Sequence, residues 1–365
     1  MRTELVPGTV APHRVPLQAF RIGAEDHRER GLVRGVTLAA SIRATARRYA
    51  GLFVDLGISE VDQRAAADAS LAALRVWAPR QHEEILGIAH GAELDVLDLG
   101  LTLARTEILT LAEAAPGECS TVAHQSQGAS VSAQTWDWYA QFSGCWHAHR
   151  VDPLEGELAH AGFAEHGMPA KIGMNAAGVG VHLNILKHRD DSPGGVPVHS
   201  VLNRVLSEAG SVAEGLEIIR SAPTTSSSVL TLVGADRVAM VEVAPGRVSV
   251  LDGEGWRVHT NHFLARDQQE GALLLNPESD TRDRLAYLEG TTGRALVPRT
   301  PDELIPLLCS PLDQGGVALL PDETKDPKER LATLVTVVLD PARRRVQVSP
   351  GVPQHAHEAN VTYHL

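Results

Sequence analysis

Apolar residues in the first third of the chain recur at helical spacing. Residues 37–55 carry small and apolar side chains every three to four positions, which predicts an amphipathic helix. Ser59, followed three positions later by Asp62, resembles a capping box and predicts the start of a second helix, which stops at Pro79. Residues 94–108 place leucine and alanine on one helical face and predict a third helix.

After Pro116-Gly117 the pattern changes to short runs of alternating or continuous apolar residues, which are typical of strands. The predicted strands are residues 119–124, 131–138, 179–186, 229–233, 237–243, 247–251, 333–339 and 345–348. Helical patterns interrupt these strands at residues 198–209, 212–221, 281–289 and 301–308. Helices gathered around many antiparallel strands predict a layered α+β fold, with two sheets between helix layers.

Residues 1–118 are interpreted as a helical N-terminal segment and residues 119–365 as the core. We expect these to be parts of one fold, because the N-terminal helices have no strands of their own to cover. The change of pattern at residue 117 is then a point inside that fold.

Composition limits the classes of partner. A formal net charge of −12 argues against nucleic acid or an anionic membrane surface. No run of eighteen apolar residues occurs, and the first residues lack the apolar region of a secretion signal. We therefore expect a cytoplasmic protein without membrane spans, and a small-molecule substrate.

The chain contains three cysteines, Cys119, Cys145 and Cys309, without a CxxC pair. They predict neither a disulfide framework nor a zinc ribbon, and they suit a reducing compartment. A single cysteine at a strand start is commonly a small buried apolar residue, which is the interpretation we prefer for Cys145 and Cys309.

Cys119 follows Gly117-Glu118 and allows a second interpretation. A thiol attacks carbonyl groups as a thiolate and needs a base. At a chain N-terminus its own α-amine, with a pKa of about 7.7–8.0, can serve. The thiol would first attack the carbonyl of Glu118, and Gly117 would allow the backbone to bend toward it. Glu118–Cys119 is therefore the candidate cleavage site.

Several motifs, taken in this order and spacing, resemble the acyl-coenzyme A:6-aminopenicillanic acid acyltransferase family of the N-terminal-nucleophile hydrolase superfamily. The matching segments are Ala104-Arg105-Thr106-Glu107, Gly117-Glu118-Cys119-Ser120-Thr121, Trp136-Asp137-Trp138, Gly173-Met174-Asn175, His259-Thr260-Asn261-His262 and Ser279-Asp280-Thr281-Arg282-Asp283-Arg284. The resemblance implies a four-layer αββα sandwich that cleaves itself. Glu118 departs from the family pattern, which often has a smaller residue before the cysteine.

The resemblance also implies roles for single residues. Cys119 would be both the self-processing group and the catalytic nucleophile. Asp137 would orient the new amine and the thiol, and Asn261 would donate a hydrogen bond to the oxyanion. Arg282 would hold a substrate carboxylate or the Asp137 side of the site.

Ser279 and Trp138 complete the candidate substrate-binding set. The resemblance implies no resident cofactor and no metal, although acyl-coenzyme A could be the acyl donor. The α and β chains produced by cleavage would stay associated, and a homo-oligomer is compatible with the sequence.

Each of these residues also has a structural interpretation. Asp137 could be an acid at a strand end, and Asn261 could form a hydrogen-bonded loop. Trp136 and Trp138 share one strand face, with Asp137 on the other, which is typical of packing. The histidine pairs 147/149, 259/262 and 355/357 could suggest zinc, but no clustered acid or cysteine completes a set.

Two functions follow. The first is an autoprocessing enzyme that moves an acyl group from a small acylated amine or thioester, through a Cys119 thioester, to water or an amine. The second is an unprocessed, non-catalytic member that binds an acyl compound or a partner in the same pocket. Self-cleavage distinguishes them.

Overall fold

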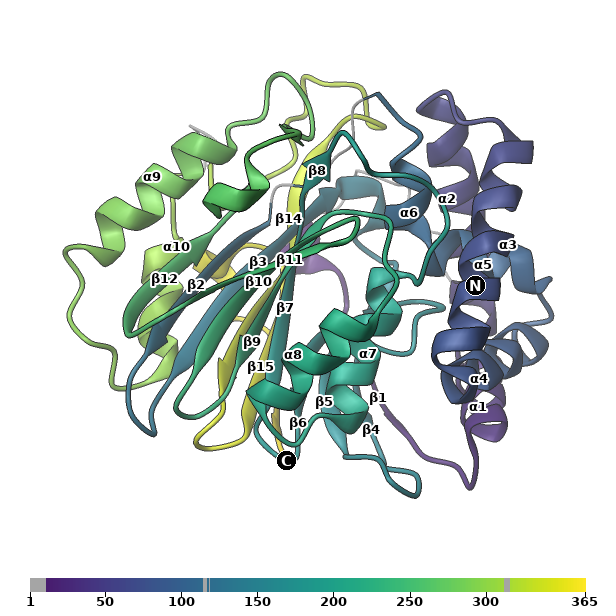
Figure 1. Cartoon of the computed structure of the whole chain (residues 1–365), viewed down its shortest axis with the longest axis horizontal. Coiled ribbons are helices and arrows are strands. Elements are labelled where there is room, and N and C mark those ends of the chain that lie inside the picture. Colours follow the sequence, from purple (N-terminus) through teal and green to yellow (C-terminus); the bar gives the residue numbers. More distant parts are fainter. Residues whose placement is uncertain (1–10, 114–116, 118, 312–315) are drawn as a thin grey trace.

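Two β-sheets stacked face to face form the centre of the molecule (Figure 1). The computed structural model describes residues 11–113, 117, 119–311 and 316–365. Trp136 of one sheet and Phe163 of the other meet between them, with ring centroids 5.4 Å apart. The apolar core therefore lies in the layer that the two sheets enclose.

The larger sheet has eight strands in the order β1-β4-β5-β6-β7-β9-β10-β11. Neighbouring strands are antiparallel except β1 and β4, which are parallel. Its strands are β1 (Ala19–Ile22), β4 (Trp146–Val151), β5 (His160–Glu165), β6 (Ile172–Asn175), β7 (Gly180–Ile185), β9 (Ser228–Val233), β10 (Val238–Ala244) and β11 (Arg247–Asp252).

The smaller sheet has six antiparallel strands in the order β12-β2-β3-β14-β15-β16. These are β12 (Gly255–His259), β2 (Ser120–Gln125), β3 (Val131–Tyr139), β14 (Leu331–Asp340), β15 (Arg345–Pro350) and β16 (Val361–His364). A separate short pair joins β8 (Lys187–His188) to β13 (Ala272–Leu273).

Helices cover the outer face of each sheet. α7 (Val198–Glu208) and α8 (Val212–Ser221) pack on the larger sheet, whereas α9 (Thr281–Thr292) and α10 (Ile305–Leu308) pack on the smaller one (Figure 1). The predicted α+β class, with two sheets between helix layers, is confirmed.

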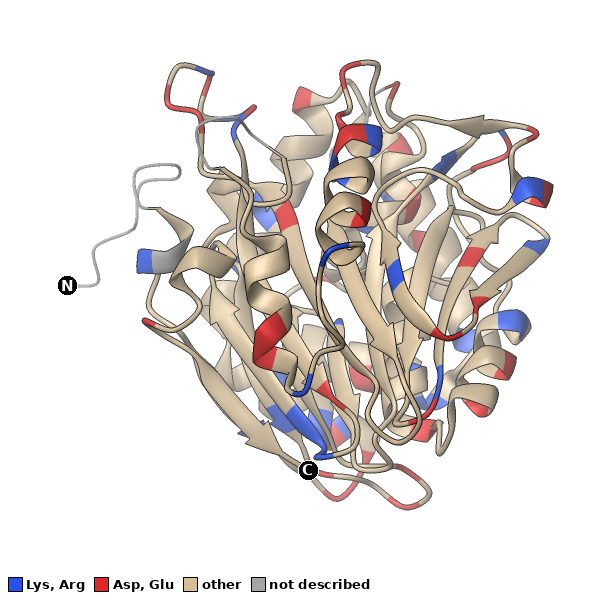
Figure 2. Cartoon of the chain, turned by 90° about the vertical axis from the view of Figure 1, so that its left-hand side faces the viewer, with Lys and Arg blue, Asp and Glu red and all other residues tan. Residues whose placement is uncertain are grey.

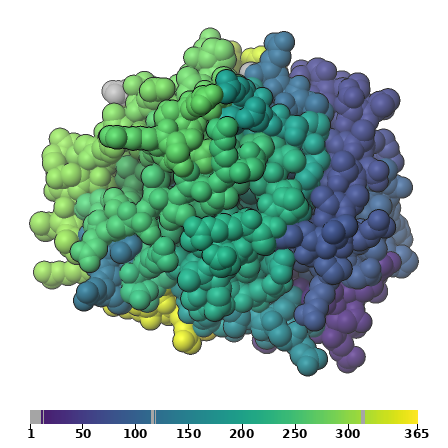
Figure 3. All heavy atoms as spheres, in the orientation of Figure 1, coloured from purple at the N-terminus to yellow at the C-terminus, as the bar shows by residue number. Residues whose placement is uncertain are grey.

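The N-terminal helices form a block at one side of the molecule, which Figure 3 shows as a continuous surface. They are α1 (His27–Thr37), α2 (Ala39–Asp55), α3 (Glu60–Trp77), α4 (Pro79–Gly91), α5 (Val96–Leu103) and α6 (Arg105–Leu109). The cap of α3 is as predicted, because the Ser59 side chain accepts a hydrogen bond from the Asp62 amide at 3.1 Å. The helix predicted over residues 94–108 is broken at Ala104 into α5 and α6.

α1 and α4 were not predicted, because glycine rather than large apolar residues makes their contact. A Cβ atom on Gly31 would lie 2.0 Å from the Glu84 carbonyl oxygen, and one on Gly87 would lie 2.2 Å from the Arg28 carbonyl oxygen. The two helix backbones touch only because these side chains are absent. A hydrophobic-periodicity search does not detect such a pair.

β1 belongs to the N-terminal segment, yet it pairs with β4 of the larger sheet, so residues before and after position 118 share a sheet. β4 and β5 also lay outside the predicted strands. Histidines, among them His147, His149 and His160, occupy the face of these strands that is turned away from the other sheet, and they are almost completely buried. Trp146, Ala148 and Phe163 on the opposite face belong to the core between the sheets. A polar residue type at buried positions concealed the strand pattern.

Positions of acidic and basic residues are mixed along the ribbon in Figure 2, mostly in helices and loops and at a few places on strands. Among the described helices, none is both long enough and apolar enough to cross a membrane.

The buried histidines make the fold sensitive to acid. Burial lowers the pKa of each; the group comprises His147, His149, His160, His166, His182 and His199. For His160 and His166 the pKa falls from 6.5 to about 4. Between these pH values the unfolded chain binds protons that the folded chain does not, so stability falls as pH drops below 6.5. Burial raises the pKa of Glu107 to about 7, so the folded chain binds one proton there that the unfolded chain does not. This one proton increases stability as the pH falls and partly offsets the histidines.

We therefore expect the free energy of unfolding, measured with urea, to decrease steeply from pH 7 to pH 5, by roughly 2 kcal/mol for each such histidine. The variant His160→Phe keeps a ring of similar size without the titrating nitrogens, and it should show a shallower slope. A free energy of unfolding that stays constant over this range would contradict the prediction.

Candidate active site

Cys119 lies immediately before β2, and only 3% of it is exposed. Ser120 of β2 pairs with Thr135 of β3 in an antiparallel register, so the preceding residue, Cys119, lies opposite Trp136. Cross-strand neighbours share a face, so the Cys119 side chain lies on the inner face, between the two sheets. It belongs to the same apolar cluster as Trp136.

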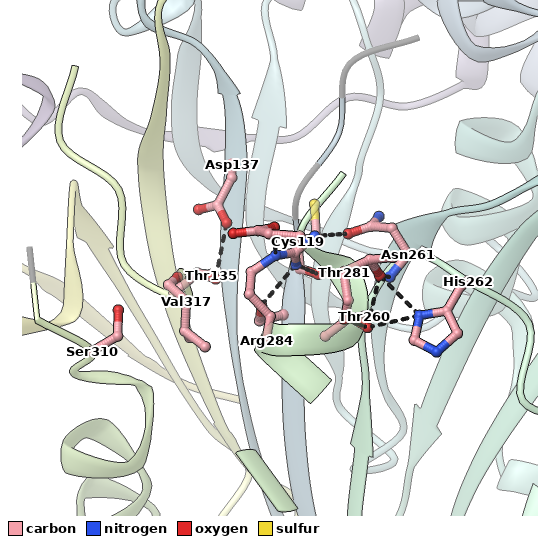
Figure 4. Close-up of polar contacts among 12 residues, drawn as sticks. Cys119, Thr135, Asp137, Thr260, Asn261, His262, Thr281, Arg284, Ser310 and Val317 are labelled. Carbon is pink, nitrogen blue, oxygen red and sulfur yellow. Dashed lines mark hydrogen bonds and ion pairs between the residues drawn. The ribbon is translucent and has the colours of Figure 1, made fainter. Parts of the chain in front are cut away.

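The backbone carbonyl of Cys119 is held from two sides. Asn184 on β7 donates its side-chain amide to this oxygen at 2.9 Å. Arg284 on α9 donates to it at 3.1 Å, and Figure 4 shows Arg284 beside Cys119. Arg284 also donates to the Ser120 hydroxyl at 3.1 Å. The larger sheet and the outer helix layer thus fix one residue of the smaller sheet.

Asn261 is brought into this site by the same arginine. Its side-chain oxygen accepts a hydrogen bond from Arg284 at 3.2 Å, and its side-chain amide donates to the Ile185 carbonyl at 2.9 Å. Its backbone amide donates to the Thr281 hydroxyl at 2.7 Å (Figure 4). The Thr-Asn-His segment therefore joins the end of β12 to the start of α9, and it places the Asn261 amide beside Cys119.

Asp137 lies on the opposite face of β3 from the two tryptophans, as the alternation predicts. Its carboxylate accepts a hydrogen bond from the Thr333 hydroxyl at 2.6 Å. It accepts a second one from the Thr135 hydroxyl at 3.4 Å (Figure 4). It is 1% exposed. Its charge acts on the Cys119 thiol, and its backbone hydrogen-bonds that thiol.

The predicted substrate-binding residues are dispersed. Arg282 is exposed at the start of α9, while Arg284, two positions on, is buried against Cys119. Ser279 lies in the turn before α9, with a buried hydroxyl that has no hydrogen-bond partner among the described residues. Trp138 is packed in the core, with the Arg105 guanidinium 4.3 Å from its ring centroid. The structure thus brings Cys119, Asn261 and Arg284 together and leaves Arg282 outside this contact.

Burial dominates the electrostatics of Cys119 and raises the pKa of its thiol to about 11. The negative charge of Asp137 adds to this rise. The hydrogen bond from the Asp137 backbone, together with the positive charges of Lys171 and Arg284, acts against it. The thiol therefore needs a neighbouring base or added positive charge to react near neutral pH.

A buried ionic cluster, of which the sequence motifs contain only Arg105, lies next to Cys119. Glu165 on β5 accepts hydrogen bonds from Arg105 at 3.0 Å, from Lys171 at 2.8 Å and from the Tyr49 hydroxyl. Both cations interact electrostatically with Cys119. Arg105 belongs to the motif before the nucleophile, but Glu165 and Lys171 lie in stretches without any recognisable pattern.

A cavity of about 150 Å³ opens beside the segment that precedes Cys119. Thr106, Leu109, Ile185 and Leu275 form part of its wall. A Cβ atom on Gly117 would lie 3.4 Å from Leu275 and 3.8 Å from Ile185, so the chain passes this cavity shortly before Cys119. A larger hollow of about 520 Å³ between β11, β12 and α9 contains none of the site residues.

Within the described part of the chain, no three histidine, cysteine, aspartate or glutamate side chains are grouped as a metal site requires. His259 instead contacts Glu242 at 2.9 Å, and His262 contacts the Thr281 hydroxyl at 3.0 Å. The candidate cleavage residue Glu118 lies outside the described residues.

Comparison with known proteins gives one family. The model of the family described as acyl-coenzyme A:6-aminopenicillanic acid acyl-transferase matches residues 124–355. The acyl-coenzyme A:6-aminopenicillanic-acid-acyltransferase 40 kDa form of Emericella nidulans is 30% identical over 301 residues, which cover 78% of each chain.

Two solved structures are similar at lower identity. A mutant conjugated bile acid hydrolase from Clostridium perfringens has a TM-score of 0.46 at 15% identity, covering 68% of this chain and 92% of that one. Penicillin V acylase from Agrobacterium tumefaciens has a TM-score of 0.40 at 16% identity, covering 64% of this chain and 82% of that one.

The contacts of Arg284 predict a large difference between two nearby arginines. Arg284→Met removes the buried donors to Cys119 and Asn261, so the free energy of unfolding should fall by about 3 kcal/mol or more. The matched control Arg282→Met changes an exposed residue and should stay within about 0.5 kcal/mol of wild type. Equal effects in urea unfolding would show that the Arg284 contacts contribute little.

Proposed function

Because the chain belongs to the acyl-coenzyme A:6-aminopenicillanic acid acyl-transferase family, we propose that it is a self-cleaving acyltransferase or amide hydrolase with Cys119 as its nucleophile. The observation that carries this proposal is the set of contacts around Cys119. Cys119 follows directly on the candidate cleavage bond, and its thiol is buried. Asn184 and Arg284 fix the backbone carbonyl of Cys119, and Arg284 also holds Asn261 at the same site.

Self-cleavage begins with the uncut chain. The Cys119 sulfur attacks the carbonyl carbon of Glu118, the peptide C–N bond breaks, and a thioester forms while Cys119 gains a free amine. Water then hydrolyses the thioester to give the Glu118 carboxylate and restore the thiol. Gly117 supports this step, because its φ of 144° is a conformation open to glycine and strained for other residues.

Turnover then uses the new amine as the base for its own thiol. The thiolate attacks the carbonyl of a substrate amide or thioester, and the acyl group stays on Cys119 until water or an amine removes it. Asn261 donates to the oxyanion of each tetrahedral intermediate, and Asp137 orients the amine. Asn184, which sequence reasoning missed, holds the residue that carries both reacting groups.

The cavity beside Gly117 supports a small substrate. Its volume of about 150 Å³, with a wall formed in part by Leu109, Ile185 and Leu275, suits a compact acyl group. Acyl-coenzyme A or a small acylated amine would donate that group. The part of Ser279, Trp138 and Arg282 in substrate binding stays a prediction from the sequence.

The two chains produced by cleavage would stay together. Tyr49, Leu52 and Phe53 of α2 share one apolar cluster with Cys119 and Trp138, and β1 pairs with β4. Cutting one peptide bond leaves this core intact. The assembly of several copies stays a prediction from the sequence.

Cys119→Ala should leave an uncut chain and abolish turnover, because it removes the attacking atom. Cys119→Ser should still process slowly, since a hydroxyl can form the ester analogue, and it should lose most turnover. Intact-mass analysis and release of a leaving group measure the two effects. A Cys119→Ala chain that is cut normally would place the cleavage site elsewhere.

Asn261→Ala should lower the turnover rate by about 10²–10³, the usual effect of losing one oxyanion donor. The exposed Asn360 offers a matched control, because Asn360→Ala removes the same group far from the site. Both rates should be measured on completely cut protein. An Asn261→Ala rate within a factor of about two of wild type would exclude Asn261 from the oxyanion site.

A further inference from the structure

Self-cleavage and turnover differ in the base that is available. In the cut protein the α-amine of Cys119 can accept the thiol proton. In the uncut chain that nitrogen belongs to a peptide bond and has no basic lone pair. Burial meanwhile holds the thiol in its protonated form, with a pKa of about 11. Some other group must take the proton before the sulfur can attack.

Lys171 is the described side chain best placed to take it. The residue precedes β6, is 1% exposed, and lies in the layer between the sheets. Its ammonium nitrogen lies 3.4 Å from the ring centroid of Trp136, the residue level with Cys119. It also interacts electrostatically with the Cys119 thiol.

The charges around Lys171 favour a shared proton. Arg105 and Lys171 both contact the Glu165 carboxylate, so two cations share one anion, to which Tyr49 adds a neutral hydroxyl. The net charge of Arg105, Lys171 and Glu165 is zero if Lys171 loses its proton. If Lys171 keeps its proton and Cys119 becomes a thiolate, the net charge of the four side chains is again zero.

Burial lowers the pKa of Lys171 to about 7, against the attraction of Glu165, so its neutral form is accessible near neutral pH. Burial, with a smaller contribution from the positive charge of Arg105, thus makes the lysine a usable base.

The other polar groups near the site suit this task less well. Arg105 and Arg284 have guanidinium groups, which do not act as bases. The Asp137 carboxylate accepts from the Thr333 and Thr135 hydroxyls on the opposite face of β3. His199 faces Lys171 and Arg105, and burial and their charges lower its pKa well below 6.5.

We propose that Lys171 accepts the thiol proton of Cys119 in the uncut chain and returns it to the Cys119 nitrogen as the peptide bond breaks. The inference rests on the proposed self-cleavage and names the base for that step. The proton leaves sulfur for the lysine nitrogen, and the sulfur forms a bond to the Glu118 carbonyl carbon. The C–N bond then breaks, its electron pair stays on nitrogen, and the lysine proton completes the new amine.

The test compares variants that separate a proton acceptor from a fixed charge. Lys171→Met removes both the charge and the base, and Lys171→Arg keeps the charge without an accessible base. Lys325→Met, at an exposed lysine, is the matched control. The rate of conversion from one chain to two is followed by intact mass from pH 5.5 to pH 9, and a cooperative thermal transition confirms that each variant folds.

We expect both Lys171 variants to be cut at least about 10²-fold more slowly than wild type, the usual contribution of a general base. The rise of the wild-type cleavage rate through about pH 7 should disappear in both. Molecules of Lys171→Met that have been cut after long incubation should turn over substrate, because the Cys119 amine then serves as the base, although more slowly than wild type because the Lys171 charge near the thiol is gone.

Three results would overturn the inference. Lys171→Met could be cut at the wild-type rate with the same pH profile, or Lys171→Arg could restore cutting and so show that only the charge matters. Cut Lys171→Met could also stay as inactive as the uncut chain, which would indicate a structural role. A wild-type chain that never cuts itself would refute the proposed function itself, a distinct outcome.

Discussion

The carbonyl oxygen of Cys119 accepts hydrogen bonds from Asn184 and Arg284, and the geometry of the site depends on this shared contact. Asn184 belongs to the larger sheet, Arg284 belongs to the outer helix α9, and Cys119 immediately precedes β2 of the smaller sheet. Arg284 also donates a hydrogen bond to Asn261, so one guanidinium positions both the proposed nucleophile and the proposed oxyanion donor. A buried arginine with several such bonds is a rigid support, because its planar donors fix direction as well as distance.

Burial of Cys119, the proposed nucleophile, makes its thiol hard to deprotonate, and the other charged groups of the site act on this difficulty. The layer between the sheets keeps water from the thiol and also raises its pKa. Positive charge from Lys171, Arg105 and Arg284 surrounds the sulfur, and Glu165 holds two of these cations in place. A free amine on Cys119 would then add a base at the nucleophile itself, which explains why cleavage would precede turnover.

Much of the fold follows from local patterns, because alternation and capping depend on neighbouring residues. The α3 cap at Ser59 and the strands on either side of the 244–246 turn are examples. β4 and β5 were missed because histidines occupy their buried positions, and α1 and α4 because glycines form their contact. In the site, Cys119 and Asn261 came from motifs, whereas Lys171 and Glu165 meet only in the folded chain. The choice between Arg282 and Arg284 depends on which helix face is buried, and the weak apolar pattern of α9 does not indicate it.

The central claim is that the active form carries Cys119 as a free N-terminal residue. Intact-mass analysis of a preparation that is turning over substrate tests it most directly, combined with N-terminal labelling of the same sample. The account predicts two chains, one ending at Glu118 and one beginning at Cys119, with the turnover rate proportional to the labelled Cys119 amine. A single uncut chain of 365 residues that turns over substrate at the full rate would contradict it.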